Sequence, residues 1–248
     1  MRYQHCLTLM VSTLALLVGA SPPTALPDNP AVAPEPRSGP WLKQHEAFLA
    51  NAAQGGIDLL FLGDSITALW IKTAPDIWTR YYEPRKAANF GIGGDRTQHL
   101  LWRIDHGELD GIKPRVVVLM IGTNNLPLQT EDQVFDGIKA VIDRVQLKLP
   151  ESKILLLGLT PRALNRDPSQ ALAAADPRVP ALNLRLARLE TAPKLRYLDL
   201  GPKLLDPASG QLVQPLQPDF LHLSRTAYQT WADTMEPLLW EMMDEQVK

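Results

Sequence analysis

Residues 115–121 read Arg-Val-Val-Val-Leu-Met-Ile, and residues 122–124 directly after them read Gly-Thr-Asn. A nearly continuous apolar run of this length is typical of a strand that is buried on both faces of a parallel sheet. Residues 57–62 and 154–157 form two shorter runs of the same kind, and each of them also leads into a glycine. The three runs therefore predict strands of one buried parallel sheet.

Amphipathic patterns alternate with these runs. Apolar residues recur at helical spacing through residues 134–145, and again through residues 182–189 before a further expected strand at residues 195–200. A last helix is expected from Ser224 onward. Strands that alternate with helices predict an α/β fold, a three-layer α/β/α sandwich with right-handed crossovers. Active sites in such folds lie at the carboxyl ends of the strands.

Composition places the chain among ordinary globular domains. Its 248 residues are 45% hydrophobic and 21% charged, which suits one domain with a full core. A formal net charge of -2 provides no basic face for a phosphate backbone, and 6% aromatic residues provide no stacking platform for single strands. We therefore expect no nucleic-acid partner.

The first 20 residues have the features of a secretory signal peptide. Arg2 and His5 precede the uncharged run of residues 6–18, and small residues follow up to Ala20. The run is shorter than the roughly 20 apolar residues of a membrane span. We therefore expect cleavage, export to the periplasm or the medium, and no stable membrane span afterwards. An uncleaved anchor or a buried helix is the alternative interpretation.

The segments on either side of the expected cleavage point limit the chemistry and set the domain boundary. Cys6 is the only cysteine, so the mature chain would have no disulfide, no thiol nucleophile and no cysteine zinc site. Residues 21–40 are dense in proline and predict an extended linker that cannot pack a core. The folded domain is then expected to span residues 41–248.

Two polar motifs occur in the first half of this domain. Gly63-Asp64-Ser65 follows the strand at residues 57–62, where a serine lies at the start of a helix beside free backbone amides. Alone, it is more simply a helix N-cap. Gly91-Ile92-Gly93-Gly94-Asp95 can bring backbone amides close to an anion, although a tight turn would use the same residues. Arg96 stands where a dinucleotide-binding fingerprint requires glycine.

Two more motifs complete the set. Gly122-Thr123-Asn124-Asn125 follows the most apolar strand, and an asparagine amide there can donate to developing negative charge. Asp219 and His222 lie three residues apart before the last helix, so the carboxylate can orient the imidazole. Taken singly, a turn asparagine and a solvated Asp–His pair explain these two motifs equally well.

Together the four motifs contain the parts that acyl transfer requires: a hydroxyl, a base, an orienter for the base and donors for the oxyanion. No Gly-x-Ser-x-Gly elbow supports the α/β-hydrolase route, and no His-Glu-x-x-His cluster supports a metallohydrolase. We therefore expect neither a metal nor a cofactor. His45, His99 and His106 lack comparable company and are interpreted as surface or helix-face residues.

The same four segments, in this order, resemble the four blocks of the SGNH, or GDSL, hydrolases. Within that family the chain is most similar to the catalytic subunits of platelet-activating factor acetylhydrolase isoform Ib, over about residues 41–160 and the last 30. The resemblance implies a flavodoxin-like parallel sheet of about five strands. It also implies roles for the site residues: Ser65 as nucleophile, His222 as base and acid, Asp219 as its orienter, and an oxyanion hole made by Ser65, Gly94 and Asn124.

Some features depart from the family's pattern. Residues 164–180 and 201–218 do not resemble it, and loops there could shape the substrate mouth. Ile66 stands where the family usually has leucine. The expected signal peptide also sets the chain apart from the named enzymes, which are intracellular. These departures leave the substrate open but not the chemistry.

The leading interpretation is a serine esterase that acts on short acyl esters, above all acetyl, with an O-acetylated glycan as one candidate substrate. A phospholipid-directed acetylhydrolase or lysophospholipase and an arylesterase are the enzymatic alternatives. A non-catalytic binding module would show losses in the four blocks, and none is missing. The expected partners are thus small-molecule, glycan or lipid esters, and the resemblance also suggests a homodimer.

Overall fold

The computed structural model describes residues 29–167, 169 and 172–244, so the expected signal peptide of residues 1–20 lies outside the described residues. A five-stranded sheet contains β1 (Leu59–Gly63), β2 (Ala87–Gly91), β3 (Val116–Met120), β4 (Lys153–Leu157) and β6 (Leu195–Leu198). The α-helices are α1 (Pro40–Gln54), α2 (Ser65–Ala68), α3 (Trp70–Thr73), α4 (Pro75–Tyr81), α5 (Thr97–Asp105), α6 (Glu131–Lys148), α7 (Arg178–Ala187) and α8 (Arg225–Met242). Two short strands, β5 (Leu172–Ala173) and β7 (Leu212–Val213), pair separately. The 3-10 turns are η1 (Pro30–Val32), η2 (Glu83–Arg85) and η3 (Gly201–Lys203).

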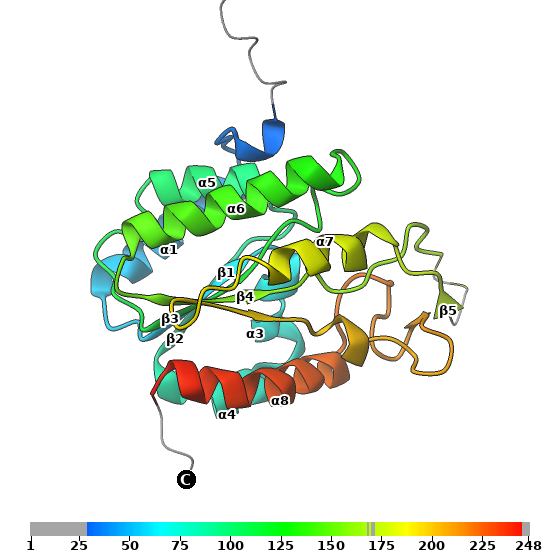
Figure 1. Cartoon of the computed structure of the whole chain (residues 1–248). Helices are drawn as coiled ribbons and strands as arrows, with labels where there is room; N and C mark the ends of the chain where they lie inside the picture. Colours follow the sequence, from blue (N-terminus) through cyan, green and yellow to red (C-terminus); the bar gives the residue numbers. More distant parts are fainter. Residues whose placement is uncertain (1–28, 168, 170–171, 245–248) are drawn as a thin grey trace, which may run out of the picture.

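The central sheet has the strand order β2-β1-β3-β4-β6, and neighbouring strands run parallel. Figure 1 shows α1, α5, α6 and α7 on one face of the sheet and α3, α4 and α8 on the other. The arrangement is the three-layer α/β/α sandwich that the alternation of patterns predicts. The sheet lies between the two helix layers, so the central strands β1 and β3 are apolar throughout.

The register of the strands determines where the polar motifs meet. Gly63, the last residue of β1, pairs with Gly91 at the end of β2 and with Met120 at the end of β3. All five residues of β1 and of β3 are buried. Because three parallel strands end level, the chain that leaves each of them emerges at the same edge of the sheet.

Helix α6 forms where helical spacing predicts it. Thr130 accepts a hydrogen bond from the Gln133 backbone, and the Gln133 side chain accepts one from the Thr130 backbone, which is a reciprocal capping box. Glu131 and Asp132 stand in the first turn, where negative charge favours a helix. The buried face consists of Val134, Gly137, Ile138, Val141, Ile142 and Val145.

The hydrophobic pattern of the sequence did not predict several of the observed elements. Strand β2 reads Ala-Ala-Asn-Phe-Gly, too short and too polar to be recognised as a strand, although β1 pairs with it along its whole length. Helices α2, α3 and α4 are short and follow one another closely. The β5–β7 pair joins the two segments, residues 164–180 and 201–218, in which the family resemblance fades.

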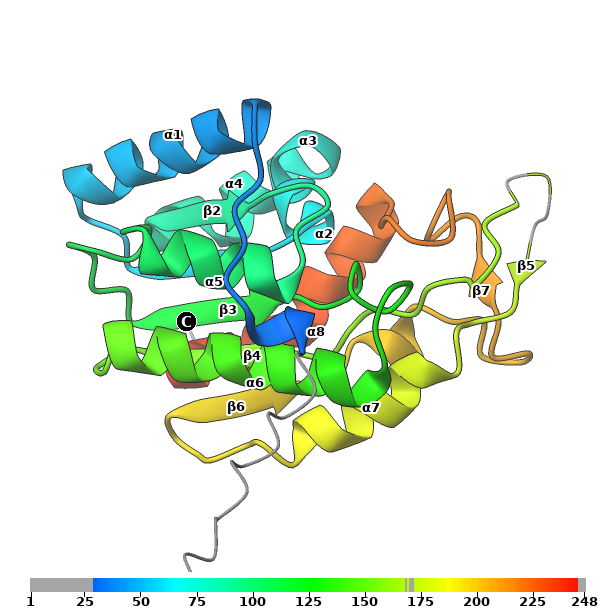
Figure 2. The same cartoon turned by 90° about the horizontal axis from the view of Figure 1, so that it is seen from above.

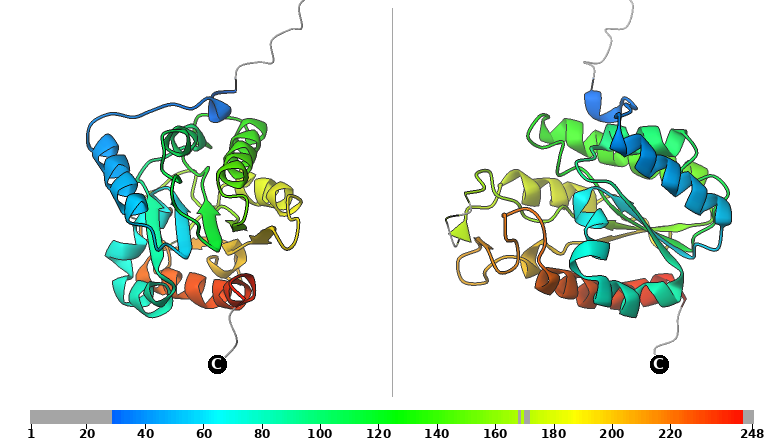
Figure 3. Two further views of the ribbon diagram at one scale, coloured as in Figure 1. Left: turned by 90° about the vertical axis from the view of Figure 1, so that its left-hand side faces the viewer. Right: turned by 180° about the vertical axis from the view of Figure 1, so that it is seen from behind.

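The proline-rich segment differs from the expected tether. Residues 29–39, which we call the amino-terminal arm, pack on the domain, and the Ala31 side chain is fully buried. The Ala31 carbonyl accepts a hydrogen bond from Thr97 Oγ1 at 2.7 Å, and the Glu35 N–H donates to the Gln98 carbonyl at 3.1 Å. Figures 2 and 3 show the arm crossing from η1, beside α6, over the start of α5 to α1. The domain therefore begins before residue 41, because specific hydrogen bonds hold an extended chain that has no core of its own.

Candidate active site

Ser65 lies at the first position of α2, directly after the strand β1. The preceding residue, Asp64, caps this helix, since its Oδ1 accepts a hydrogen bond from the Ile66 N–H at 2.9 Å. The chain turns so tightly here that a Cβ on Gly63 would collide with the Thr67 side chain and with the Met120 carbonyl. The serine is thereby held, half-buried, at the edge of the sheet.

His222 and Asp219 meet Ser65 in one hydrogen-bonded line. Ser65 Oγ lies 2.9 Å from His222 Nε2, and His222 Nδ1 lies 2.7 Å from Asp219 Oδ2. When Nδ1 carries its hydrogen toward the carboxylate, Nε2 presents a lone pair to the serine hydroxyl. The structure thus brings together the three residues for which the sequence predicts the nucleophile, the base and its orienter.

The backbone around Asp219 is shaped by its own carboxylate. Asp219 Oδ1 accepts hydrogen bonds from the N–H groups of Leu221 at 3.2 Å and His222 at 2.7 Å. Phe220 has a φ of 55°, in the left-handed region that costs a non-glycine residue about 1–3 kcal/mol. Its N–H donates to the Gln217 carbonyl at 2.9 Å, and its carbonyl accepts from the Ala163 N–H at 3.0 Å. Hydrogen bonds on both sides thus stabilise this strained residue.

Asp219 is ionised in the neutral range. Partial burial alone would raise its pKa, but the His222 backbone and ring and the Leu221 backbone hold the pKa below its ordinary value. Arg166 Nη1 lies 3.6 Å from Asp219 Oδ2, at the solvent side of the carboxylate. The Asp219 carboxylate opposite His222 therefore stays charged at neutral pH.

The predicted oxyanion donors lie on the neighbouring loops. Gly94 has a φ of 77°, and within the described part of the chain its N–H has no hydrogen-bond partner. Asn124 Nδ2 donates to the Asp95 carbonyl at 2.9 Å, so its amide is oriented by the loop that carries Gly94. Asn125 fixes the end of the same loop, because its Oδ1 accepts from the Thr97 N–H at 3.1 Å.

A buried charge cluster lies beneath this loop, and sequence reasoning missed it. The Asp95 carboxylate accepts from Trp41 Nε1 at 2.7 Å and lies 3.0 Å from Arg103 Nε. Arg103 also binds Glu108 at 2.5 Å, and the side chains of Asp95, Arg103 and Glu108 are completely buried. Burial raises the pKa of Asp95, and the attraction of Arg103 opposes that rise.

His45 and His99 do lie on helices, α1 and α5, but their interpretation as surface residues is wrong. Each is only 3–4% exposed, whereas His106 is exposed. His45 Nδ1 lies 3.3 Å from Glu108, at the rim of the buried charge cluster. Burial, followed by the repulsion of Arg96 and other arginines, lowers the pKa of His99 to about 4. Histidine burial depends on partners far away in sequence, which no local pattern reports.

Asp64 has an unusual environment for a carboxyl group beside a nucleophile. It is fully buried, and its Oδ2 has no hydrogen-bond partner among the described residues. Burial raises its pKa to about 7; the Ile66 N–H opposes this rise, and the neighbouring Asp95 adds to it. The carboxyl group therefore gains its charge near neutral pH, well above the range of an exposed aspartate.

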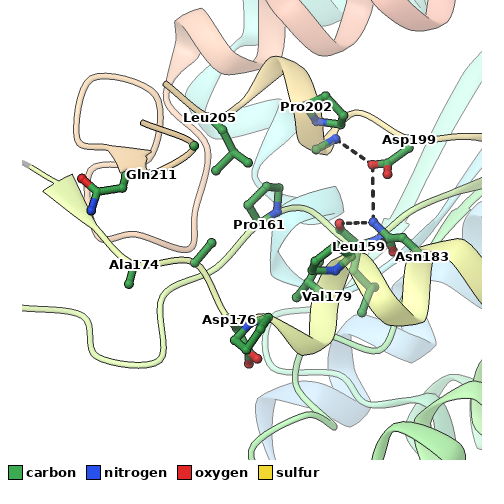
Figure 4. Close-up of a pocket in the computed structure, with 15 residues that line it drawn as sticks. Leu159, Pro161, Ala174, Asp176, Val179, Asn183, Asp199, Pro202, Leu205 and Gln211 are labelled. Atoms are coloured by element: carbon green, nitrogen blue, oxygen red, sulfur yellow. Dashed lines mark hydrogen bonds between the residues drawn. The ribbon is translucent and has the colours of Figure 1, made fainter. Parts of the chain in front are cut away.

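A cavity of about 500 Å³ lies beside this site and is shown in Figure 4. Apolar side chains form most of its wall, and its Asp199 accepts from the Gly201 N–H at 2.8 Å. Ser65, Asp219 and His222 do not line it. Leu205, on its wall, also packs against the small apolar cluster that contains Phe220. The hydrogen-bonded line of Ser65, His222 and Asp219 therefore lies outside the lining of this cavity.

The described residues contain no group of histidines and carboxylates with the arrangement of a metal site. Nor does any helix in the described ranges combine the length and the apolar character needed to cross a bilayer.

Residues 61–230 match the model of the GDSL-like lipase/acylhydrolase family, and the chain belongs to this family. It is a carboxylic ester hydrolase. Its curated relatives include platelet-activating factor acetylhydrolase IB subunit alpha1 from Bos taurus, 35% identical over 223 residues that cover 88% of this chain and 92% of the relative. Subunit alpha2 from Gallus gallus is 33% identical and covers 83% and 86% respectively.

Solved structures share the fold. The crystal structure of an acylhydrolase from Bacteroides fragilis superposes with a TM-score of 0.66 at 20% identity, over 80% of this chain and 96% of the other. The expected membership of the SGNH/GDSL hydrolases and the expected sheet architecture are both confirmed.

Proposed function

We propose that this protein is a serine esterase that hydrolyses short acyl esters, acetyl above all, through an acyl-enzyme on Ser65. His222 is the general base and acid, and Asp219 orients its imidazole. The backbone amides of Ser65 and Gly94 and the side chain of Asn124 form the oxyanion hole. The observation that carries the proposal is the line of hydrogen bonds, 2.9 Å from Ser65 to His222 and 2.7 Å from His222 to Asp219.

In the first half-reaction Ser65 Oγ attacks the ester carbonyl while its proton passes to His222 Nε2. The carbonyl oxygen becomes an oxyanion that the three donors stabilise, and each donor is typically worth about 3–4 kcal/mol of barrier. His222 then gives the proton to the departing alcohol. In the second half-reaction His222 deprotonates water, which attacks the acyl-enzyme; His222 then returns this proton to Ser65 Oγ as the tetrahedral intermediate collapses and the acid leaves.

The preference for acetyl rests on the curated relatives, which are named acetylhydrolases and align with 88% of this chain at 35% identity. The alcohol is a separate question. An exported enzyme would meet O-acetylated glycans, and we propose them as the natural substrates, with export by the signal peptide expected at residues 1–20. A phospholipid-type acetyl ester remains the second candidate, since the names of the relatives refer to such a lipid.

The test of the mechanism is labelling of the folded protein with a fluorophosphonate probe, followed by peptide mass spectrometry. Ser65 should carry the label, and Ser65→Ala should lose nearly all hydrolysis of p-nitrophenyl acetate. Ser209→Ala is the control, because Ser209 is an exposed serine whose hydroxyl donates to the Asp206 carboxylate at 2.8 Å and has no histidine partner among the described residues. Unlabelled Ser65, together with full activity of Ser65→Ala, would refute the mechanism.

The test of the substrate is competition between esters. We expect p-nitrophenyl acetate to be turned over faster than the butyrate and octanoate esters. Acetylated xylan should release acetate faster than a phospholipid-type acetyl ester presented in mixed micelles. A higher kcat/KM for the lipid ester would transfer the proposal to the second candidate. Faster turnover of octanoate would exclude the acetyl preference.

A further inference from the structure

The amino-terminal arm places the guanidinium group of an arginine against the loop that carries Gly94. Arg37, the last long side chain of the arm, donates from Nη1 to the Gly93 carbonyl at 2.8 Å and to Asp95 Oδ1 at 3.0 Å. Its guanidinium nitrogens lie 3.5 Å from the point where a Cβ on Gly94 would stand. The guanidinium therefore lies against the Gly93–Gly94 peptide unit, and the arm lies outside the residues that match the family.

The contact with the Gly93 carbonyl has a direct effect on the Gly94 N–H. A peptide unit is planar and trans, so its C=O and its N–H point in opposite directions from one rigid plane. An arginine that fixes the Gly93 carbonyl therefore also fixes the direction of the Gly94 N–H. A cationic donor on the carbonyl polarises the peptide as well, which makes the N–H a stronger donor.

The loop needs such a restraint. Gly93 and Gly94 are both exposed, and two successive glycines have more backbone freedom than any other pair. Trp41 and Arg103 hold the Asp95 side chain, and Asn124 holds the Asp95 carbonyl. The Asp95 N–H closes the turn by donating to the Ile92 carbonyl at 3.2 Å, but none of these bonds is made by the Gly93–Gly94 peptide itself. A Cβ on Gly93 would stand 4.0 Å from Ser65 Cβ, so this peptide lies next to Ser65.

We propose that Arg37 is a positioning residue for the oxyanion hole: it holds the Gly93–Gly94 peptide so that the Gly94 N–H is aimed at the oxyanion. The proposal rests on the proposed function of Ser65 and Gly94. The rest of the arm is held by the hydrogen bond from Thr97 Oγ1 to the Ala31 carbonyl, and this anchor positions Arg37 against the loop. Asp95 keeps Arg103 as its partner without Arg37, so the loss of Arg37 leaves no buried charge unpaired.

The experiment compares Arg37→Ala and Arg37→Lys with the parent in the full chain. For Arg37→Ala we expect kcat for p-nitrophenyl acetate to fall about tenfold, less than the loss of a donor itself. KM should stay within about twofold, because the ground-state carbonyl is bound weakly by the hole. Lysine can donate one hydrogen bond to the Gly93 carbonyl, so Arg37→Lys should recover most of kcat. The acid limb of the pH–rate profile, which reports on His222, should not move.

Arg144→Ala is the matched control, because it removes an arginine ion pair with Asp105 at the far end of α5 and α6 and should leave kcat unchanged. Ala31→Asp is the second variant, since a buried charge there should release the arm while Arg37 is intact. It should reproduce the kcat loss of Arg37→Ala, and the double variant should be no worse than either single one.

The outcomes separate this inference from the proposed function. An Arg37→Ala enzyme with parental kcat overturns the inference, and so does a rise in KM alone, which would make Arg37 a substrate-binding residue. Loss of kcat that lysine does not restore, with a matching loss of thermal stability, assigns Arg37 a structural role and also overturns it. If Ser65→Ala retains turnover, the proposed function fails whatever Arg37 does.

Discussion

The two halves of the site are built in different ways. The oxyanion half, which contains the proposed donors Ser65, Gly94 and Asn124, follows the ends of the central strands. It lies over the buried charge cluster, in which the side chains of Asp95, Arg103 and Glu108 have no solvent contact. The acid–base half consists of Asp219 and His222, which lie in a segment without regular secondary structure. Their side chains are 46% and 33% exposed. One half is held by buried ion pairs and strand ends, the other by turns.

The supports beneath the acid–base half are few. The buried residues Ala163, Ala173, Leu212 and Phe220 form a small apolar cluster separate from the main core. Two of these residues, Ala173 and Leu212, lie in residues 164–180 and 201–218, where the sequence departs from the family's pattern. A stable oxyanion half and an adaptable acid–base half allow the rim to change with the substrate while the donors for the oxyanion stay in place.

The largest effect is expected from removing the centre of the buried charge cluster. Arg103→Met removes the buried cation that Asp95 and Glu108 share and leaves only Arg37 beside Asp95 and His45 beside Glu108. Breaking a buried ion pair in this way costs about 3–5 kcal/mol. Urea unfolding followed by circular dichroism measures this loss in the free energy of unfolding. Arg185→Ala, which removes an exposed pair with Asp132, should change stability by less than about 1 kcal/mol. Equal losses in the two variants would show that the charge cluster does not support the oxyanion half.

A loss confined to turnover is expected at the donor itself. Asn124→Ala should lower kcat by roughly 100- to 1,000-fold, the usual result of deleting one oxyanion donor. The free energy of unfolding should change little, because the lost bond to the Asp95 carbonyl is half-exposed. Steady-state kinetics and thermal melting measure the two quantities. An unchanged kcat would remove Asn124 from the oxyanion hole.

The next effect depends on pH and concerns Asp64. Its folded pKa of about 7 exceeds the unfolded value of 3.8, so the folded state binds more protons between these values and loses stability as pH rises. From pH 5 to pH 8 the loss is about 2–3 kcal/mol, at about 1.4 kcal/mol per pKa unit. The asparagine in Asp64→Asn cannot ionise, so the free energy of unfolding of this variant should not show this decrease.

The measurement is urea unfolding of Asp64→Asn and the parent at both pH values. His99 titrates in both proteins: its low pKa makes stability fall as pH drops below about 6.5, and this contribution cancels in the comparison. A difference between the two proteins that does not change with pH would mean that Asp64 is already ionised at pH 5.

The smallest effect should arise in the acid–base half. Phe220→Ala removes the largest side chain of the small apolar cluster, and we expect kcat to fall on the order of tenfold through a less well-placed His222. Hydrogen exchange should show faster amide exchange at residues 219–222 while residues 59–63 keep the parental rate. Slower turnover without faster exchange would place the role of Phe220 elsewhere.

The sequence reveals the parts of the molecule that have local signatures. Strands β1, β3 and β4 are recognisable because burial on both faces demands continuous apolar runs, and two of the four motifs, those that contain Ser65 and Asn124, because each follows such a run. Arg37 is not recognisable, since its contact with Gly93 spans 56 residues and its proline-rich neighbours have the composition of a linker. The pairing of Arg103 with Asp95 is hidden for a related reason: burial of charge depends on tertiary partners and not on spacing.

Helix α8 connects the two halves directly. Ser224, two residues after His222, caps it, and one turn later Tyr228 donates from its hydroxyl to the Ile66 carbonyl at 2.5 Å, next to the nucleophile. Ser65 and His222 are 157 residues apart, so a growing chain carries its serine long before it has the base. The serine and the imidazole therefore meet only after the segment that contains α8, Arg225–Met242, has been synthesised and has packed on the domain. Until then Ser65 has no base, so a nascent chain that carries the serine cannot yet form an acyl-enzyme by the proposed mechanism.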